Sequence, residues 1–186
     1  YPALFALVVA LIGGTNATSL IYAGLAPTIW LPFAIVRREV TFRDALAFVA
    51  RTLLLTAAVS AWWISGLASQ AAYGLDVLAY SETVKTVASD SQASEVLRGL
   101  GNWFFYGRDG ISAWIQPSLT YTENLAVLAV SFAVPILSLA AAACLRWVHR
   151  AYFVTLVLVG TALSVGVYPY NSPSPAGALF KAFATG

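Results

Sequence analysis

The sequence has very little charge. Only 10% of its 186 residues are Asp, Glu, Lys or Arg, while 60% are hydrophobic. A soluble domain usually carries about 25% charged residues, so this composition excludes an ordinary soluble globular protein. The formal net charge of +2 is also too small to indicate binding to nucleic acid.

The sequence has a single cysteine and no methionine. Cys144 is the single cysteine, which excludes an internal disulfide and every metal site built from cysteine pairs. The chain contains no Met, begins Tyr1-Pro2 and has no basic stretch before its first apolar run, so we do not expect an intact signal peptide. We expect the sequence to be a segment of a longer membrane protein, with part of any active site outside it.

Long apolar runs make up most of the chain. A bilayer core of about 30 Å needs about 20 mostly apolar residues in a helix. The runs predict an all-α, polytopic membrane protein with spans at about 3–13 (partial), 16–36, 45–68, 124–145 and 151–168. Pro135 lies within one of these runs and predicts a kink.

Two short loops carry half of the lysine and arginine residues, which predicts the orientation. Their basic residues are Arg37, Arg38, Arg43, Arg146, His149 and Arg150. The positive-inside rule places such loops in the cytoplasm. The loop 69–122 and the tail 169–186 are then external, in a multi-pass protein of the plasma membrane.

The external loop 69–122 predicts short amphipathic helices. From Asp76 to about Ala88, apolar residues recur at helical spacing, and Glu82 points nearly opposite to them. A second helix is expected to begin with the capping box Ser89-x-x-Gln92 and to end at Gly99 and Gly101. Amphipathic helices that carry aromatic residues and charge suit a membrane surface where a lipid-linked substrate is bound.

Several stretches resemble one known family. They are Gly13–Ala17, Ala45–Ala47, Trp62–Ile64, Ser94–Gly101, Trp103, Phe105–Gly107, His149–Phe153 and Pro169-Tyr170. Together they resemble the large actinobacterial (mycobacterial-type) α-(1→3)-arabinofuranosyltransferases of the D type. Members of that family are GT-C glycosyltransferases of the membrane. The resemblance implies transfer of arabinofuranose from decaprenyl-phosphate arabinose to arabinan of arabinogalactan and lipoarabinomannan, with inversion and α-(1→3) branching.

The resemblance also implies a site. Inversion needs a carboxylate as general base on the acceptor hydroxyl. In GT-C enzymes an essential acid usually lies in the first external loop, which we expect upstream of Tyr1. Within the sequence we predict Glu82 as the catalytic acid. The predicted substrate-binding residues are Tyr80, Lys85, Arg98, Trp103, Arg108 and Asp109.

Each of these residues also has a plain structural interpretation. Glu82 and Lys85 have the spacing of solvated side chains. Arg98 follows Glu95 by three residues, the spacing of an ion pair on a helix surface. Arg108 and Asp109 fit a turn, and the aromatic run 103–106 fits an interfacial anchor.

Two other functions compete with the enzyme. Gly13-Gly14 and Pro135 are features of transporters or flippases, but the spans lack an acid or a base near mid-membrane. A non-catalytic scaffold subunit with the loop as a docking surface is the third alternative. No metal-ligand pattern is present in the sequence, although some sugar-polymerising GT-C enzymes use a divalent cation.

Overall fold

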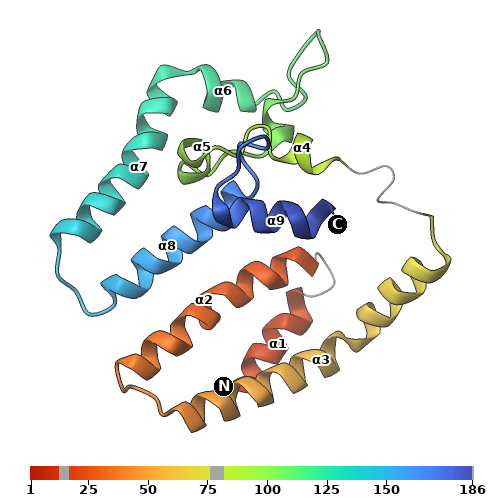
Figure 1. Cartoon of the computed structure of the whole chain (residues 1–186), viewed down its shortest axis with the longest axis vertical. Helices are drawn as coiled ribbons and strands as arrows, with labels where there is room; N and C mark the ends of the chain where they lie inside the picture. Colours follow the sequence, from red (N-terminus) through yellow and green to blue (C-terminus); the bar gives the residue numbers. More distant parts are fainter. Residues whose placement is uncertain (13–16, 76–81, 186) are drawn as a thin grey trace. The chain divides into compact units, whose positions relative to one another are not determined.

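The chain is described by a computed structural model that covers residues 1–12, 17–75 and 82–185. Over these ranges it contains helices and loops but no strand, so the predicted all-α class is confirmed for them. Figure 1 shows the helices along the sequence. Contacts divide the chain into two compact units, residues 1–80 and residues 81–186, and each unit has its own packing.

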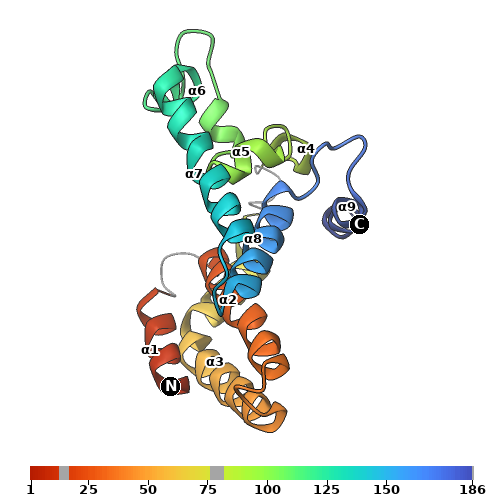
Figure 2. The ribbon, with the colours of Figure 1, turned by 90° about the vertical axis from the view of Figure 1, so that its left-hand side faces the viewer.

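The first unit contains three apolar helices. They are α1 (Pro2–Ile12), α2 (Ala17–Val36) and α3 (Phe42–Tyr73). α1 lies alongside α3, and α2 also contacts it (Figure 2). The first turn of α3 is capped by Thr41, whose side chain accepts from the N–H of Asp44 at 3.2 Å. Its 32 residues extend over about 48 Å at 1.5 Å per residue, which is longer than a bilayer core.

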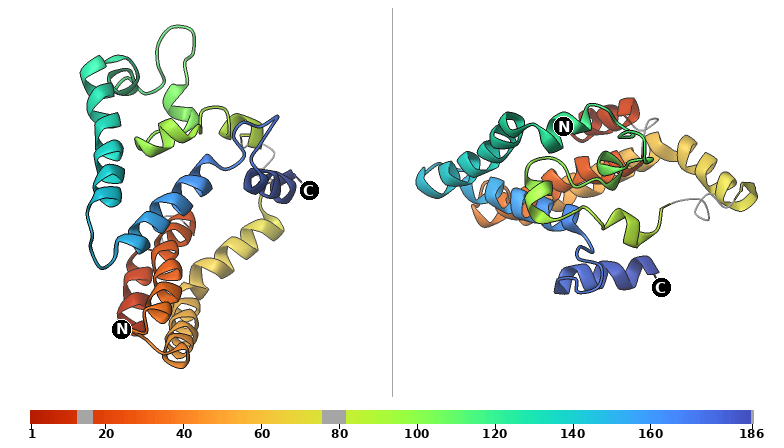
Figure 3. Two further views of the ribbon diagram at one scale, coloured as in Figure 1. Left: turned by 60° about the vertical axis from the view of Figure 1, so that its left-hand side comes forward. Right: turned by 90° about the horizontal axis from the view of Figure 1, so that it is seen from above.

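The second unit contains two longer helices and several short ones. In chain order these are α4 (Val84–Val87), α5 (Ala93–Leu97), the 3₁₀ helix η2 (Trp103–Tyr106), α6 (Ser118–Glu123), α7 (Leu125–Cys144), α8 (Arg150–Val165) and α9 (Pro175–Thr185). α7 and α8 form a hairpin that opens away from the loop 145–149 (Figure 3). α5 packs on α8, and α4 packs on α9.

Two helices of the described chain, α3 and α7, are long and apolar enough to cross a membrane. α1, residues Tyr22–Val36 of α2, and α8 are apolar but shorter. Pro135 lies inside α7, where it lacks the N–H that would donate to the carbonyl of Ser131. The placement of these helices in a bilayer, and the kink at Pro135, stay predictions.

The structure corrects the predicted short helices of the loop. Residues 76–81 lie outside the described residues, and Glu82 and Thr83 are not helical. Thr83 instead caps α4, and its hydroxyl accepts from the N–H of Thr86 at 3.2 Å. A Thr side chain that accepts a bond from a backbone N–H three residues further on favours a helix start over a helix interior. From Glu82 onward the helix is therefore confined to Val84–Val87.

The predicted capping box at Ser89 is also wrong. The Ser89 hydroxyl lies 2.8 Å from the carbonyl oxygen of Thr86 and 2.6 Å from the carboxylate of Asp90, and these two acceptors share its single proton. Gln92 is the actual cap residue of α5, and it makes no side-chain cap bond. The preceding turn therefore uses the Ser89 hydroxyl that the capping box needed.

The predicted end of this second helix is confirmed. Gly99 and Gly101 have φ of 81° and 93°, the left-handed conformation that glycine adopts without a Cβ penalty. The N–H of Leu100 donates to the carbonyl of Glu95 at 2.9 Å. The chain thereby reverses directly after Arg98, and this reversal turns η2 back toward α5.

The segment after η2 folds back on itself around an aromatic ring. The N–H of Trp114 donates to the carbonyl of Gly107 at 3.0 Å, and an isolated bridge joins Arg108 to Ala113. A Cβ on Gly107 would lie 2.0 Å from Cε3 of the Trp114 ring. Only glycine therefore allows the ring to lie against this backbone.

We predict that Gly107→Ala lowers the free energy of unfolding by about 1–3 kcal/mol, because the new methyl overpacks the contact with Trp114. Thermal unfolding of the full-length protein in detergent, followed by tryptophan fluorescence, measures the effect. Gly160→Ala in α8 is the matched control, since its Cβ position has no atom within 4 Å other than its chain neighbours and the nearby backbone of its own helix. Equal melting temperatures for the two variants would contradict the packing at Gly107.

Candidate functional site

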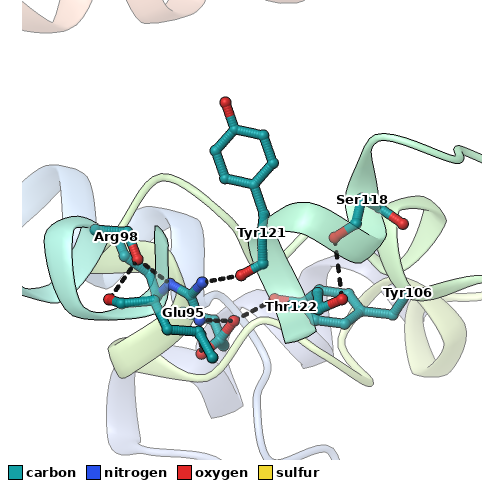
Figure 4. A network of polar contacts seen from close by, with 8 residues as sticks. Glu95, Arg98, Tyr106, Ser118, Tyr121 and Thr122 are labelled. Atoms are coloured by element: carbon teal, nitrogen blue, oxygen red, sulfur yellow. Dashed lines mark hydrogen bonds and ion pairs between the residues drawn. The ribbon is translucent and has the colours of Figure 1, made fainter. Parts of the chain in front are cut away.

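Arg98 lies at the centre of a buried polar network (Figure 4). Its side chain is only 3% exposed. Nη1 donates to both carboxylate oxygens of Glu95, at 3.1 and 3.2 Å, and Nε donates to the hydroxyl of Ser131 at 3.0 Å. Nη2 donates to the carbonyl of Tyr121, and the guanidinium lies 4.9 Å from the ring centre of Phe132. One side chain thus connects α5, α6 and α7.

Tyr106 completes the network from η2. Its hydroxyl donates to Oε2 of Glu95, whose side chain is 12% exposed. Burial raises the pKa of Tyr106 above its ordinary value of 10.0, and the hydrogen bond to the negative Glu95 raises it further. The phenol therefore stays a neutral donor, and the stability it contributes is fully present below pH 10 and is lost as the pH rises toward the folded pKa.

The network is more than a surface ion pair. A buried pair offsets its desolvation only when further hydrogen bonds satisfy the remaining groups, and here Tyr106, Ser131 and the carbonyl of Tyr121 supply them. The i, i+3 spacing of Glu95 and Arg98 indicated the pair but not its burial. This geometry favours a positioning role for Arg98, and its contact with a substrate phosphate stays a prediction.

Glu82 and Lys85 are exposed, in contrast to the buried Arg98 side chain. Glu82 lies just before the cap of α4, and Lys85 lies in its first turn. In the described parts of the chain the Glu82 carboxylate has no hydrogen bond or ion pair. Tyr80 lies outside the described residues. An exposed, unpaired carboxylate is accessible to an acceptor hydroxyl, as a general base has to be.

Arg108 and Asp109 lie in the turn after η2. Nη2 of Arg108 is 2.5 Å from Oε1 of Glu123, and both side chains are more than half exposed. Oδ1 of Asp109 accepts from the N–H groups of Ser112 and Ile111, at 2.8 and 2.9 Å. These bonds lower the pKa of Asp109, so the stability it contributes is present above about pH 4 and is lost as the pH falls through the folded pKa.

Trp103 belongs to an aromatic cluster with Phe104 and Trp114. The three ring centres are 5.5–5.7 Å apart. Phe104 and Trp114 are 46% and 47% exposed, so they present more ring surface than Trp103, which is partly covered. Such rings suit either a sugar face or the membrane interface. The sequence indicated the aromatic run 103–106, but the contacts of Trp103 and Phe104 with Trp114 were not predicted, because they depend on the fold-back at Gly107.

The structure therefore groups the predicted residues into separate places. Arg98 lies in the buried network, Arg108 and Asp109 lie in one exposed turn, and Glu82 and Lys85 lie at α4. Sequence reasoning missed Ser131 and Tyr121 as partners of Arg98, and Tyr106 as a partner of Glu95, since nothing in an apolar run marks one serine as a ligand of a distant arginine. Across the described residues no group of three or more His, Cys, Asp or Glu could hold a metal ion.

The chain was compared with known protein families, curated proteins and solved structures. A family model described as "Alpha-(1->3)-arabinofuranosyltransferase, N-terminal GT-C domain" matches residues 1–186. No curated protein and no solved structure matches the chain.

We predict that Glu95→Gln lowers the free energy of unfolding by about 3–5 kcal/mol, because it leaves the Arg98 guanidinium buried without a counter-charge. Tyr106→Phe should cost about 1.5–3 kcal/mol, the value of a hydrogen bond to a charged group. Denaturant titration of the purified full-length protein in mixed micelles measures both.

Glu123→Gln is the matched control for the loss of a paired glutamate. Its partner Arg108 is exposed, so the expected cost is at most about 1 kcal/mol. If Glu95→Gln and Glu123→Gln were equally stable, the network would not have the structural role assigned to it.

Proposed function

The chain belongs to the α-(1→3)-arabinofuranosyltransferase family, along the N-terminal GT-C domain, and we propose that it transfers arabinofuranose from decaprenyl-phosphate arabinose to cell-wall arabinan. Members of such a family are glycosyltransferases that use a lipid-linked sugar and a polysaccharide acceptor. The acceptor in this proposal is the arabinan of arabinogalactan or lipoarabinomannan, and the product is an α-(1→3) branch. The match over the whole chain is the observation that carries the proposal.

The proposed location is the plasma membrane. α3 and α7 have the length and composition of membrane spans, and we assign α2 and α8 to the membrane with them. The basic loops 37–43 and 145–150 then lie in the cytoplasm, and residues 69–122 and 169–186 lie outside. This orientation puts the exposed acid and the aromatic cluster of the second unit on the side where a lipid-linked donor would present its sugar.

The proposed reaction is a single inverting displacement. The acceptor hydroxyl oxygen attacks the anomeric carbon, the bond from that carbon to the phosphate oxygen breaks, and decaprenyl phosphate leaves with the bonding electron pair. Glu82 takes the proton of the acceptor hydroxyl. Its exposure, together with the absence of a partner among the described residues, supports this role.

The other predicted residues have supporting roles. Lys85 and Arg108 are exposed cations suited to the charge that develops on the departing phosphate. Asp109, Trp103 and Tyr80 are proposed to contact the sugar. Arg98 acts through the network: it holds η2 and the turn that follows it against α6 and α7, so the turn keeps one geometry. An essential acid from another external loop would complete the site.

We predict that Glu82→Gln lowers kcat by at least about 100-fold, because general-base catalysis contributes about 10²–10⁴. The KM for the donor should change little, since the amide keeps the size of the carboxylate. The assay uses membranes that contain the full-length protein, with radiolabelled decaprenyl-phosphate arabinose and an arabinan oligosaccharide.

Asp90→Asn is the matched control, because Asp90 is an acid of the same segment whose carboxylate is engaged by Ser89 at 2.6 Å. It should keep kcat within about twofold. Normal turnover by Glu82→Gln would show that Glu82 is not the general base. If the wild-type protein instead moved the donor across a vesicle membrane without transferring arabinose, the glycosyltransferase function would be wrong.

A further inference from the structure

A continuous apolar groove lies between α7 and α8. It consists of two cavities of about 420 and 330 Å³. Both are lined by Leu139, Ala142 and Val154, so they adjoin one another. The remaining walls are almost entirely aliphatic and aromatic, which makes the groove suitable for a hydrocarbon chain and unsuitable for a polar ligand alone.

The groove ends at a positively charged loop. Arg150, the first residue of α8, lines its second cavity, and Arg146 lies exposed in the loop that precedes it. The sequence from residue 124 to residue 186 contains no Asp or Glu, so no acid of α7, α8 or α9 neutralises these arginines. The bond of Arg150 to the carbonyl of Ala143 is long, at 3.5 Å, and leaves most of the guanidinium donors for another group.

Trp147 marks the boundary between the apolar and the charged parts. It lines the first cavity, packs against Phe153 with ring centres 5.2 Å apart and is 44% exposed. Tryptophan favours the level of the lipid headgroups, where its ring is apolar and its N–H is hydrated. An apolar groove, an interfacial ring and two arginines thus follow one another along α7 and α8.

We propose that this groove binds an anionic diacyl phospholipid. Its acyl chains lie along Pro135, Leu139 and Val157, and its phosphate is bound by Arg146 and Arg150. Basic pockets between membrane helices bind lipid headgroups in this way, and guanidinium forms charge-assisted bonds with phosphate. A zwitterionic lipid has the same chains but carries a cation beside its phosphate, so it fits two arginines less well.

The site is distinct from that of the sugar donor. In the orientation given under the proposed function, on which this step rests, loop 145–150 is cytoplasmic, whereas transfer occurs on the outer side. The donor phosphate and the lipid phosphate therefore lie at opposite faces of the membrane. The lipid, bound from the inner leaflet, would keep α7 and α8 at a fixed distance from one another.

The test uses the full-length protein, purified and delipidated in detergent. Native mass spectrometry measures binding of three probes: dioleoylphosphatidylglycerol, dioleoylphosphatidylcholine and decaprenyl phosphate. We expect the wild type to bind the phosphatidylglycerol at least fivefold more tightly than the phosphatidylcholine. Arg146→Ala/Arg150→Ala should abolish this preference, and Ala142→Leu, which fills the groove and keeps the charge, should weaken both diacyl lipids.

Two matched variants separate charge from folding. Arg38→Ala/Arg43→Ala removes the same charge from the other basic loop and should leave phosphatidylglycerol binding within twofold of wild type. Arg146→Lys/Arg150→Lys keeps the charge and should retain most of the preference. Unchanged phosphatidylglycerol binding in Arg146→Ala/Arg150→Ala would overturn the proposal, as would a parallel loss of decaprenyl phosphate, which would assign the groove to the donor. If the wild-type protein bound phosphatidylglycerol but did not transfer arabinose, the proposed function would be wrong and the lipid site would still be supported.

Discussion

A buried guanidinium needs a counter-charge and a full set of acceptors, and the second unit is arranged around that requirement at Arg98. Its side chain is 3% exposed, and its partners come from separate segments: Glu95 at α5, Tyr121 in α6 and Ser131 in α7. Tyr106 of η2 joins them through Glu95. An unpaired buried charge costs several kcal/mol. The segment from α5 to η2 therefore cannot separate from α7 without leaving the Arg98 guanidinium short of hydrogen-bond acceptors. The turn that carries Arg108 and Asp109 follows η2 directly, so its position depends on the same network.

The chain has few charged residues, and the exposed ones of the second unit lie in two regions of different chemistry. On the loop of the second unit, the exposed acid Glu82 and the ion pair of Arg108 with Glu123 lie in segments that also carry the aromatic cluster. At the α7–α8 loop the charges are only positive, and they adjoin an apolar groove. The first set suits a sugar on a phosphate carrier, whereas the second suits a lipid headgroup. One hydrophobic hairpin therefore separates two regions of different chemistry.

The sequence predicted those features that depend on local patterns. The helix α7 lies within one residue of the expected 124–145 at each end, because a long, uncharged and mostly apolar run marks it. The left-handed glycines after α5 were predicted by the same local logic. The short loop helices were not, since four or five residues contain too little periodicity to outweigh turn bonds such as that of Ser89. α9 was missed in the expected tail, where Lys181 bonds the carbonyl of Tyr170 at 2.8 Å. The burial of Arg98 was beyond any local pattern, because it depends on a serine 33 residues away in the chain.

We infer that Glu95 and Arg98 stabilise the second unit as a pair. A double-mutant cycle of Glu95→Gln and Arg98→Gln, with unfolding free energies measured by denaturant titration of the full-length protein in mixed micelles, tests it most directly. We expect a coupling energy of about 1–3 kcal/mol, with the double variant more stable than the sum of the single losses implies. Single effects that add within about 0.5 kcal/mol would show that the two side chains act independently and not as a pair.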